Sequence, residues 1–117
     1  MQYLLLIYGA EKAWAALPEA ERNTLYTDYM TFTNDIKKSG HYVGGNALQP
    51  VHTATTVRVR DGKSSTTDGP FAETRAQLGG YYLVEAKDLD EATKIAARIP
   101  GARLGSIEVR PVMNHVT

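Results

Sequence analysis

Several residue patterns that carry chemistry in other proteins are missing from this sequence. It contains no cysteine, which excludes disulfides, thiolate nucleophiles and cysteine-ligated zinc or iron–sulfur centres. The histidines show no ligand spacing of the HxH or HExxH kind, so no metal site is predicted. No phosphate-binding loop, dinucleotide fingerprint or nucleophile elbow occurs either. The residues therefore imply no cofactor.

The chain also lacks an excess of charge of either sign and a long apolar run. Its 13 basic residues balance 13 acidic ones. Non-specific binding to nucleic acid or to an anionic membrane needs a basic face, so neither partner is expected. The apolar run in MQYLLLIYG is too short to span a bilayer and has no basic leader. We expect a buried strand here and a cytoplasmic protein.

Hydrophobic periodicity and turn residues predict an alternation of strands and helices. Asp88 and Glu91 form a capping-box pattern, and Asp61-Gly62 is a hairpin turn signal. Residues 10–17 suggest a loop with one helical turn, and residues 72–78 read as irregular. The expected elements are strands over residues 2–8, 41–48, 80–86 and 106–112, helices over 18–38 and 88–99, and a hairpin over 53–67.

This order predicts an α+β fold of the ferredoxin-like β-α-β-β-α-β type with an extra hairpin, as one domain over residues 1–117. Two helices cover only one face of such a sheet. The strands at 2–8 and 80–86 nevertheless carry large apolar side chains on both faces. An uncovered apolar face is an interface or an aggregation hazard, so we expect a homodimer that packs sheet against sheet.

The stretch DGPFAETRAQLGGYYLVEAKDLDEA and the closing GSIEVRPV resemble the YCII-related family, in the branch named for its DGPF motif. The resemblance also covers MQYLLLIYG, SGHYVGGNALQP and TATTVRVRDGK, so it extends over nearly the whole chain. It implies a dimeric α/β barrel. It also implies a regulatory setting, because genes of this branch often neighbour extracytoplasmic-function sigma factors. No activity is established for the family.

Smaller members of the family carry a histidine and an aspartate proposed as a catalytic pair. The histidine position falls near Tyr29 in this chain, and the helix over residues 18–38 contains no histidine. The pair therefore does not carry over intact. The aspartate is matched with Asp68, which becomes the candidate catalytic residue.

The DGPF motif and its surroundings supply further candidates. Asp68 is either a general base or anchoring carboxylate at the mouth of a cavity, or a residue that caps its turn through backbone hydrogen bonds. Phe71 and Glu73 are candidate ligand-binding residues. Glu73 and Arg75 are equally typical of a solvated loop pair.

Other polar and aromatic side chains have both a functional and a structural explanation. His41 and His52 flank the second strand and suit acid–base chemistry, or they are surface or hydrogen-bonded structural residues. His115 lies in a tail without pattern and is given no role. Tyr29, Tyr42, Tyr81 and Tyr82 either line an aromatic pocket or belong to the core. Of these residues, Tyr29, His41 and Tyr82 join Phe71 and Glu73 as ligand-binding candidates.

Two functions follow. The first is a dimeric small-molecule-binding or enzyme-like domain with a pocket near Asp68 and no assigned reaction. The second is a non-catalytic regulatory or sensor module working with an extracytoplasmic-function sigma factor. A closed cavity where Asp68 meets a second titratable group favours the first function. An Asp68 held in turn hydrogen bonds favours the second.

Overall fold

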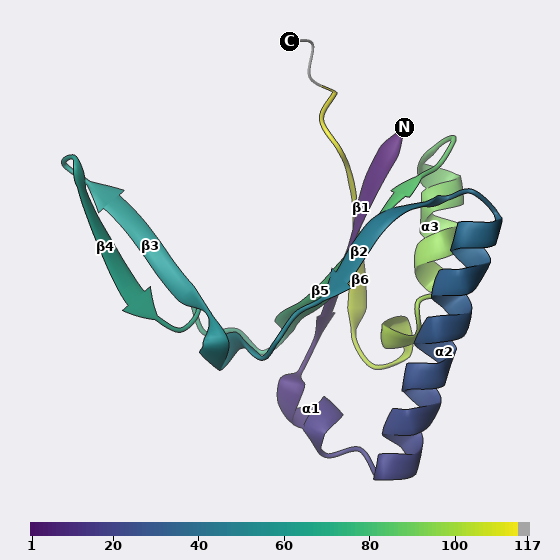
Figure 1. Cartoon of the computed structure of the whole chain (residues 1–117), viewed down its shortest axis with the longest axis horizontal. Coiled ribbons are helices and arrows are strands. Elements are labelled where there is room, and N and C mark those ends of the chain that lie inside the picture. Colours follow the sequence, from purple (N-terminus) through teal and green to yellow (C-terminus); the bar gives the residue numbers. More distant parts are fainter. Residues whose placement is uncertain (115–117) are drawn as a thin grey trace.

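A computed structural model describes residues 1–114 of the chain (Figure 1). The strands are β1 (Gln2–Gly9), β2 (Tyr42–Ala47), β3 (Thr55–Arg60), β4 (Lys63–Asp68), β5 (Gln77–Glu85) and β6 (Ser106–Pro111). The helices are α1 (Glu11–Ala15), α2 (Glu19–Lys38) and α3 (Leu89–Ala97), with short 3-10 turns η1 (Val51–Thr53) and η2 (Pro100–Arg103). His115 lies outside the described residues.

The main sheet has the strand order β2-β5-β1-β6, and each pair of neighbours is antiparallel. With helices α2 and α3 on one face, this is the expected ferredoxin-like arrangement (Figure 1). Strand β5 begins at Gln77, although residues 72–78 were predicted to be irregular. Gln77 and Leu78 pair with Gly9 and Tyr8 beyond a register shift that leaves Gly79 of β5 unpaired, as in a β-bulge.

The core lies between the sheet and the two helices. Leu5, Ile36, Val84 and Ile99 are its largest fully buried side chains, and Ile95 is 4% exposed. Leu5 comes from β1, Ile36 from α2, Val84 from β5 and Ile95 from α3, and Ile99 precedes η2, so burying these side chains joins both helices to the two central strands. Fully burying a side chain of this kind contributes about 1.5–3 kcal/mol.

Helix α3 begins where its sequence predicts, with Asp88 as the N-cap. The Asp88 carboxylate accepts a hydrogen bond from the Glu91 amide at 2.9 Å, which satisfies one free N–H group of the first turn. The Glu91 carboxylate accepts from the Lys87 amide at 3.1 Å. This is one residue earlier than the capping-box pattern predicts. The helix start is thus held from both sides.

Strands β3 and β4 form a separate two-stranded hairpin, which we call the arm (Thr55–Asp68). The arm projects on the side of the sheet away from α2 and α3 (Figure 1). Asp61 (φ 52°) and Gly62 (φ 75°) form its tip, with two consecutive positive φ values as in the tightest hairpin turns. No helix formed by the described residues is long and apolar enough to cross a membrane.

Candidate functional site

Tyr29 and Tyr82 lie on the helix side of the sheet and are engaged by their own chain. The Tyr29 hydroxyl accepts a hydrogen bond from the Gly101 amide at 3.0 Å. The Tyr82 hydroxyl lies 2.7 Å from Thr33 Oγ1, and the Tyr82 ring packs against Phe32 with a centroid distance of 5.2 Å. Tyr82 belongs to the buried core, and the half-buried Tyr29 packs against it.

Burial raises the pKa of both hydroxyls above the usual value for tyrosine. For Tyr29 the hydrogen bond from Gly101 opposes this effect, and for Tyr82 the hydrogen bond with Thr33 does. The phenols therefore stay protonated far above neutral pH. They can donate and accept hydrogen bonds, but they cannot serve as bases at neutral pH.

His41 lies at a different place, where the end of α2 meets the start of α3. Its Nδ1 atom is 2.7 Å from Ser39 Oγ, and its Nε2 atom is 3.2 Å from Glu91 Oε1. Ser39 is the C-cap of α2, and its hydroxyl also donates to the Ile36 carbonyl at 3.2 Å. His41 thus connects two helix ends. The hydroxyl, the imidazole and the carboxylate stand in a row, but on an open surface.

Asp68, Phe71 and Glu73 lie together along the base of the arm and are exposed. The turn after Asp68 is held by other groups. Gly69 N–H donates to the Ala54 carbonyl at 2.7 Å, and Thr56 Oγ1 donates to the Gly69 carbonyl at 2.9 Å. Among the described residues, none of these hydrogen bonds uses the Asp68 carboxylate. Asp68 is therefore free of the turn-capping role.

A network of hydrogen bonds fixes the base of the arm to the body. The Glu11 carboxylate accepts from the Val51 amide at 2.9 Å, and the Glu11 amide donates to Gln77 Oε1 at 2.9 Å. Gln77 Nε2 in turn donates to the Thr74 carbonyl at 2.6 Å. These contacts join α1, the segment before β3 and the loop after β4. They set the direction in which the arm leaves the sheet.

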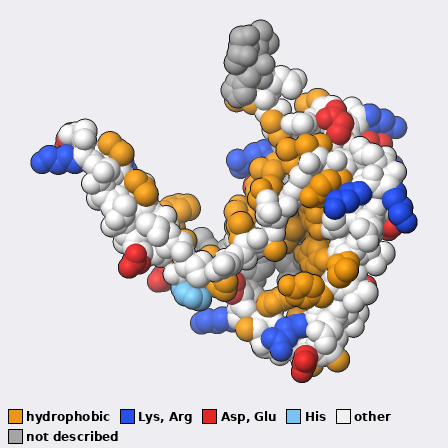
Figure 2. All heavy atoms as spheres, viewed as in Figure 1, with side chains coloured by type: hydrophobic (Ala, Val, Ile, Leu, Met, Phe, Trp, Pro, Cys, Tyr) orange, Lys and Arg blue, Asp and Glu red, His pale blue; other side chains and the backbone are white. Residues whose placement is uncertain are grey.

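The face of the sheet away from the helices is uncovered. The strand registers place Leu4 opposite Leu83 and Leu6 opposite Tyr81 on this face, while their neighbours Leu5 and Val84 point into the core. Figure 2 shows hydrophobic side chains on the body where it faces the arm. We call this surface, formed by Leu4, Leu6, Tyr8, Asn46, Tyr81 and Leu83, the outer face.

The outer face also carries polar groups. On β6, Arg110 lies opposite Leu4 and Glu108 opposite Leu6, and the two side chains form an ion pair at 3.5 Å. A second polar pair, between β2 and β5, is not evident from the sequence. The Asn46 side-chain amide donates to the Tyr81 hydroxyl at 3.0 Å. Asn46 reaches Tyr81 because β2 pairs with β5 after a register shift between Tyr42 and Gly44. The glycines at 44 and 45 were the only signal of that shift. The hydroxyl and the amide stand among leucines and can orient a mainly apolar ligand.

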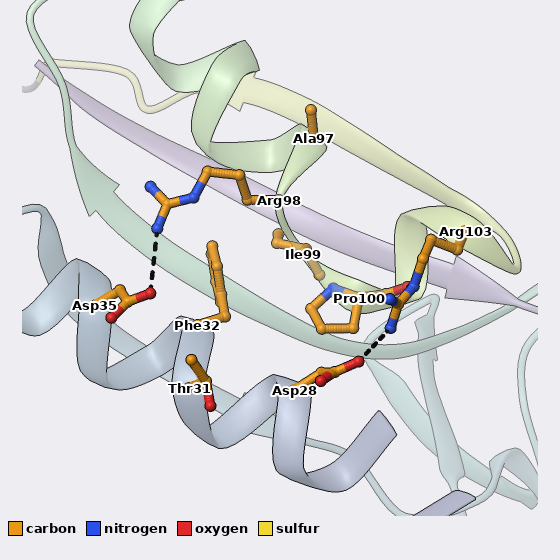
Figure 3. A pocket seen from close by; sticks show the side chains of 9 residues that line it. All are labelled: Asp28, Thr31, Phe32, Asp35, Ala97, Arg98, Ile99, Pro100 and Arg103. Carbon is orange, nitrogen blue, oxygen red and sulfur yellow. Dashed lines mark hydrogen bonds and ion pairs between the residues drawn. The ribbon is translucent and has the colours of Figure 1, made fainter. Parts of the chain in front are cut away.

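Two surface hollows lie elsewhere, on the helix side. One, of about 350 Å³, lies between α2 and the segment from α3 to η2 (Figure 3). Ion pairs span it from Arg98 to Asp35 at 3.7 Å and from Arg103 to Asp28 at 2.9 Å. The other, of about 410 Å³, adjoins it at Asp28 and Arg103. The arginines are already paired with carboxylates, and none of the predicted site residues lines either hollow.

The predicted residues thus fall into three groups, which one chain does not bring together. Tyr29 and Tyr82 lie in or against the core, His41 is at the helix ends, and Asp68, Phe71 and Glu73 are at the base of the arm. Within residues 1–114, no group of three or more histidine, aspartate and glutamate side chains is placed to hold a metal ion.

Comparison with known proteins adds a family and a fold. The model of the YCII-related domain matches residues 1–115. An uncharacterised protein of Rhizobium meliloti (strain 1021) is 34% identical over 114 residues, covering 96% of this chain and 92% of that protein.

A solved structure with a similar fold is 5-chloro-2-hydroxyhydroquinone dehydrochlorinase from Burkholderia phenoliruptrix AC1100, in complex with 2,5-dihydroxybenzoquinone. It superposes with a TM-score of 0.57 over 98% of this chain and 96% of that one. At 14% identity, this likeness supports the fold only.

Proposed function

Because the chain belongs to the YCII-related domain family, we propose that it is a homodimeric domain that binds a small molecule at the outer face, with Asp68 as a charged group of the site. The motif Asp68-Gly69-Pro70-Phe71 supports placing it in the DGPF branch of that family. The observation that carries the proposal is the polar pair of Asn46 and Tyr81 beside the leucines of β1 and β5 on the uncovered face.

The chemistry of the outer face favours a flat, largely apolar ligand with hydroxyl or carbonyl groups. Leu4, Leu6 and Leu83 supply apolar contacts. The Tyr81 hydroxyl, which already accepts from Asn46, has its own proton to donate to a ligand oxygen. The dehydrochlorinase of similar fold, whose bound molecule is 2,5-dihydroxybenzoquinone, supports this ligand class by analogy alone.

Asp68 adds a carboxylate that its own chain leaves available. Free of the hydrogen bonds of its turn, it can accept a hydrogen bond from a ligand hydroxyl, or take its proton as a general base. The proposal assigns binding to the site and leaves the reaction open. An anchoring role and a catalytic role both require that Asp68 lie next to the outer face of the functional dimer.

Binding can be tested with a probe from the expected class. Purified protein is titrated with 2,5-dihydroxybenzoquinone by calorimetry, and small molecules that copurify are identified by mass spectrometry. Tyr81→Phe and Asp68→Asn should each weaken binding at least tenfold, about 1.4 kcal/mol, since each removes one polar contact. Asp61→Asn, on the tip of the same arm, is the matched control and should bind as wild type. Equal affinity in all variants would contradict the site.

The alternative is a non-catalytic regulatory module that works with an extracytoplasmic-function sigma factor. Its support is the exposure of Phe71 (78%) and of Val57 (61%) and Val59 (59%) on the arm, as in a surface that contacts another protein. Sedimentation of the purified chain separates the two functions. A monomer with no bound small molecule, which assembles only with a sigma factor, would favour the regulatory module.

A further inference from the structure

The arm has two chemically different faces. Opposite residues of an antiparallel pair lie on the same face, and Val57 pairs with Thr66 while Val59 pairs with Ser64. Asp68, paired with Thr55, lies on this same face, which we call the valine face. The other face carries three cations, Arg58, Arg60 and Lys63. Asp68 is therefore the one ionisable side chain among the six residues of the valine face.

Within the described chain nothing covers the arm. No residue of β3 or β4 is buried, and Val57 and Val59 are 61% and 59% exposed. An isolated two-stranded hairpin is marginally stable at best in water. The radius of gyration, 16.3 Å, also exceeds the value of about 13 Å expected for a compact domain of this length. The arm therefore needs a surface that a single chain does not supply.

A second copy of the chain offers that surface. The arm projects on the side of the outer face, and hydrophobic side chains lie both on the arm and on the body across the hollow between them (Figures 1 and 2). Two copies related by a twofold axis would cover both surfaces at once, because each chain supplies one arm and one outer face. The arm needs this cover whenever the chain is folded. A second copy of the chain can always supply it, because it is present at the same concentration as the first.

We propose that the arm of each copy crosses to the second copy and lays its valine face against the partner's outer face, so that Asp68 completes the ligand site of the other chain. The cations of the opposite face stay in water, where they limit further strand association. This proposal rests on the homodimer and the outer-face site of the proposed function. It adds that neither chain contains a complete site.

Charge placed on either face of the arm tests the contact. Val57→Glu with Val59→Glu should weaken the dimer at least a hundredfold in sedimentation equilibrium, because two carboxylates would be buried without partners. Ser65→Glu with Thr67→Glu adds the same charge to the cationic face of the same hairpin. This control should leave the dimer unchanged. Equal weakening by both pairs, or by neither, would overturn the proposal, as would a monomeric wild type.

Cross-linking locates the contact even if the charged variants fail to fold. The chain has no cysteine, so Val57→Cys and Ser65→Cys each introduce a single attachment point for a benzophenone photo-cross-linker. In a mixture of nitrogen-15-labelled and unlabelled chains, the label at position 57 should yield mixed-isotope links to β1 or β5. The label at position 65 should give few such links. Links only within one chain, or only to an unrelated protein, would overturn the proposal.

These readouts need no ligand, so they separate the two proposals. If the arm crosses but 2,5-dihydroxybenzoquinone and copurified molecules fail to bind, the proposed function fails and the assembly stands. If arm variants bind the probe as monomers, the small-molecule binding of the proposed function stands and the shared site is wrong.

Discussion

The Gly101 amide donates a hydrogen bond to the Tyr29 hydroxyl at 3.0 Å, and a Cβ atom built at Gly101 would collide with the same oxygen. This contact joins η2 to the middle of α2. The next atom that such a Cβ would meet is Ile7 Cγ2, at 3.1 Å. A side chain at position 101 would therefore clash with its neighbours, chiefly with the Tyr29 hydroxyl.

Gly101→Ala and Tyr29→Phe should show strong coupling. We expect Gly101→Ala to lower the free energy of unfolding by about 1–3 kcal/mol through overpacking. Tyr29→Phe should cost about 1 kcal/mol through the lost hydrogen bond. The double variant should cost less than the sum by about 1 kcal/mol, because removing the hydroxyl makes room for the methyl group. Urea titrations of the four proteins measure this, and additive losses would contradict the packing argument.

Two tyrosines of the helix side, Tyr82 in the core and the half-buried Tyr29, predict a loss of stability at alkaline pH. Burial raises the pKa of Tyr29 and of Tyr82 in the folded state, whereas in the unfolded chain a tyrosine loses its proton near pH 10. The stabilisation is therefore complete below about pH 10 and is lost as the pH rises through the raised values. Tyr29→Phe should reduce the fall in unfolding free energy between about pH 8 and about pH 11. Tyr26→Phe, on an exposed residue of the same helix, should keep the wild-type fall.

The contribution of the α3 cap to stability can be separated from that of a surface charge. Asp88→Ala removes the acceptor of the Glu91 amide and should cost about 1 kcal/mol in unfolding free energy. Asp90→Ala is the control, since it removes an exposed first-turn charge and its ion pair with Lys94 but leaves the cap in place, and it should cost less than about 0.5 kcal/mol. Thermal and urea unfolding compare the two. Equal losses would mean that Asp88 does not cap the helix.

The core-forming elements could be predicted because their signals are local. Asp88 and Glu91 mark a helix start, and the alternation in Gln2–Tyr8 separates a core face from a second apolar face. The contact between Asn46 and Tyr81 could not be predicted, because it depends on a register shift in β2. The direction of the arm depends on Glu11 and Gln77, whose hydrogen-bond partners are distant in sequence.

Asp68 was predicted to be either a turn cap or a site residue. The two alternatives predict different unfolding free energies for Asp68→Ala. The carboxylate takes no part in the hydrogen bonds of its own turn. We therefore expect Asp68→Ala to change the unfolding free energy of the isolated chain, measured at concentrations below dimer formation, by less than about 0.5 kcal/mol. A loss of about 1 kcal/mol or more would restore the capping role.

A site shared between two chains makes a prediction that no single-chain site makes. Asp68→Asn damages the arm, and Tyr81→Ala damages the outer face, so each variant alone should lose affinity for 2,5-dihydroxybenzoquinone. When the two variants are unfolded together, refolded and mixed in equal amounts, half of the dimers should be heterodimers. In each heterodimer the intact outer face of one chain meets the intact arm of the other. The second site of that dimer carries both substitutions. Calorimetry of the mixture should then recover about one quarter of the wild-type sites at wild-type affinity. If each chain instead completed its own site, every site in the mixture would carry one substitution, and mixing would restore none.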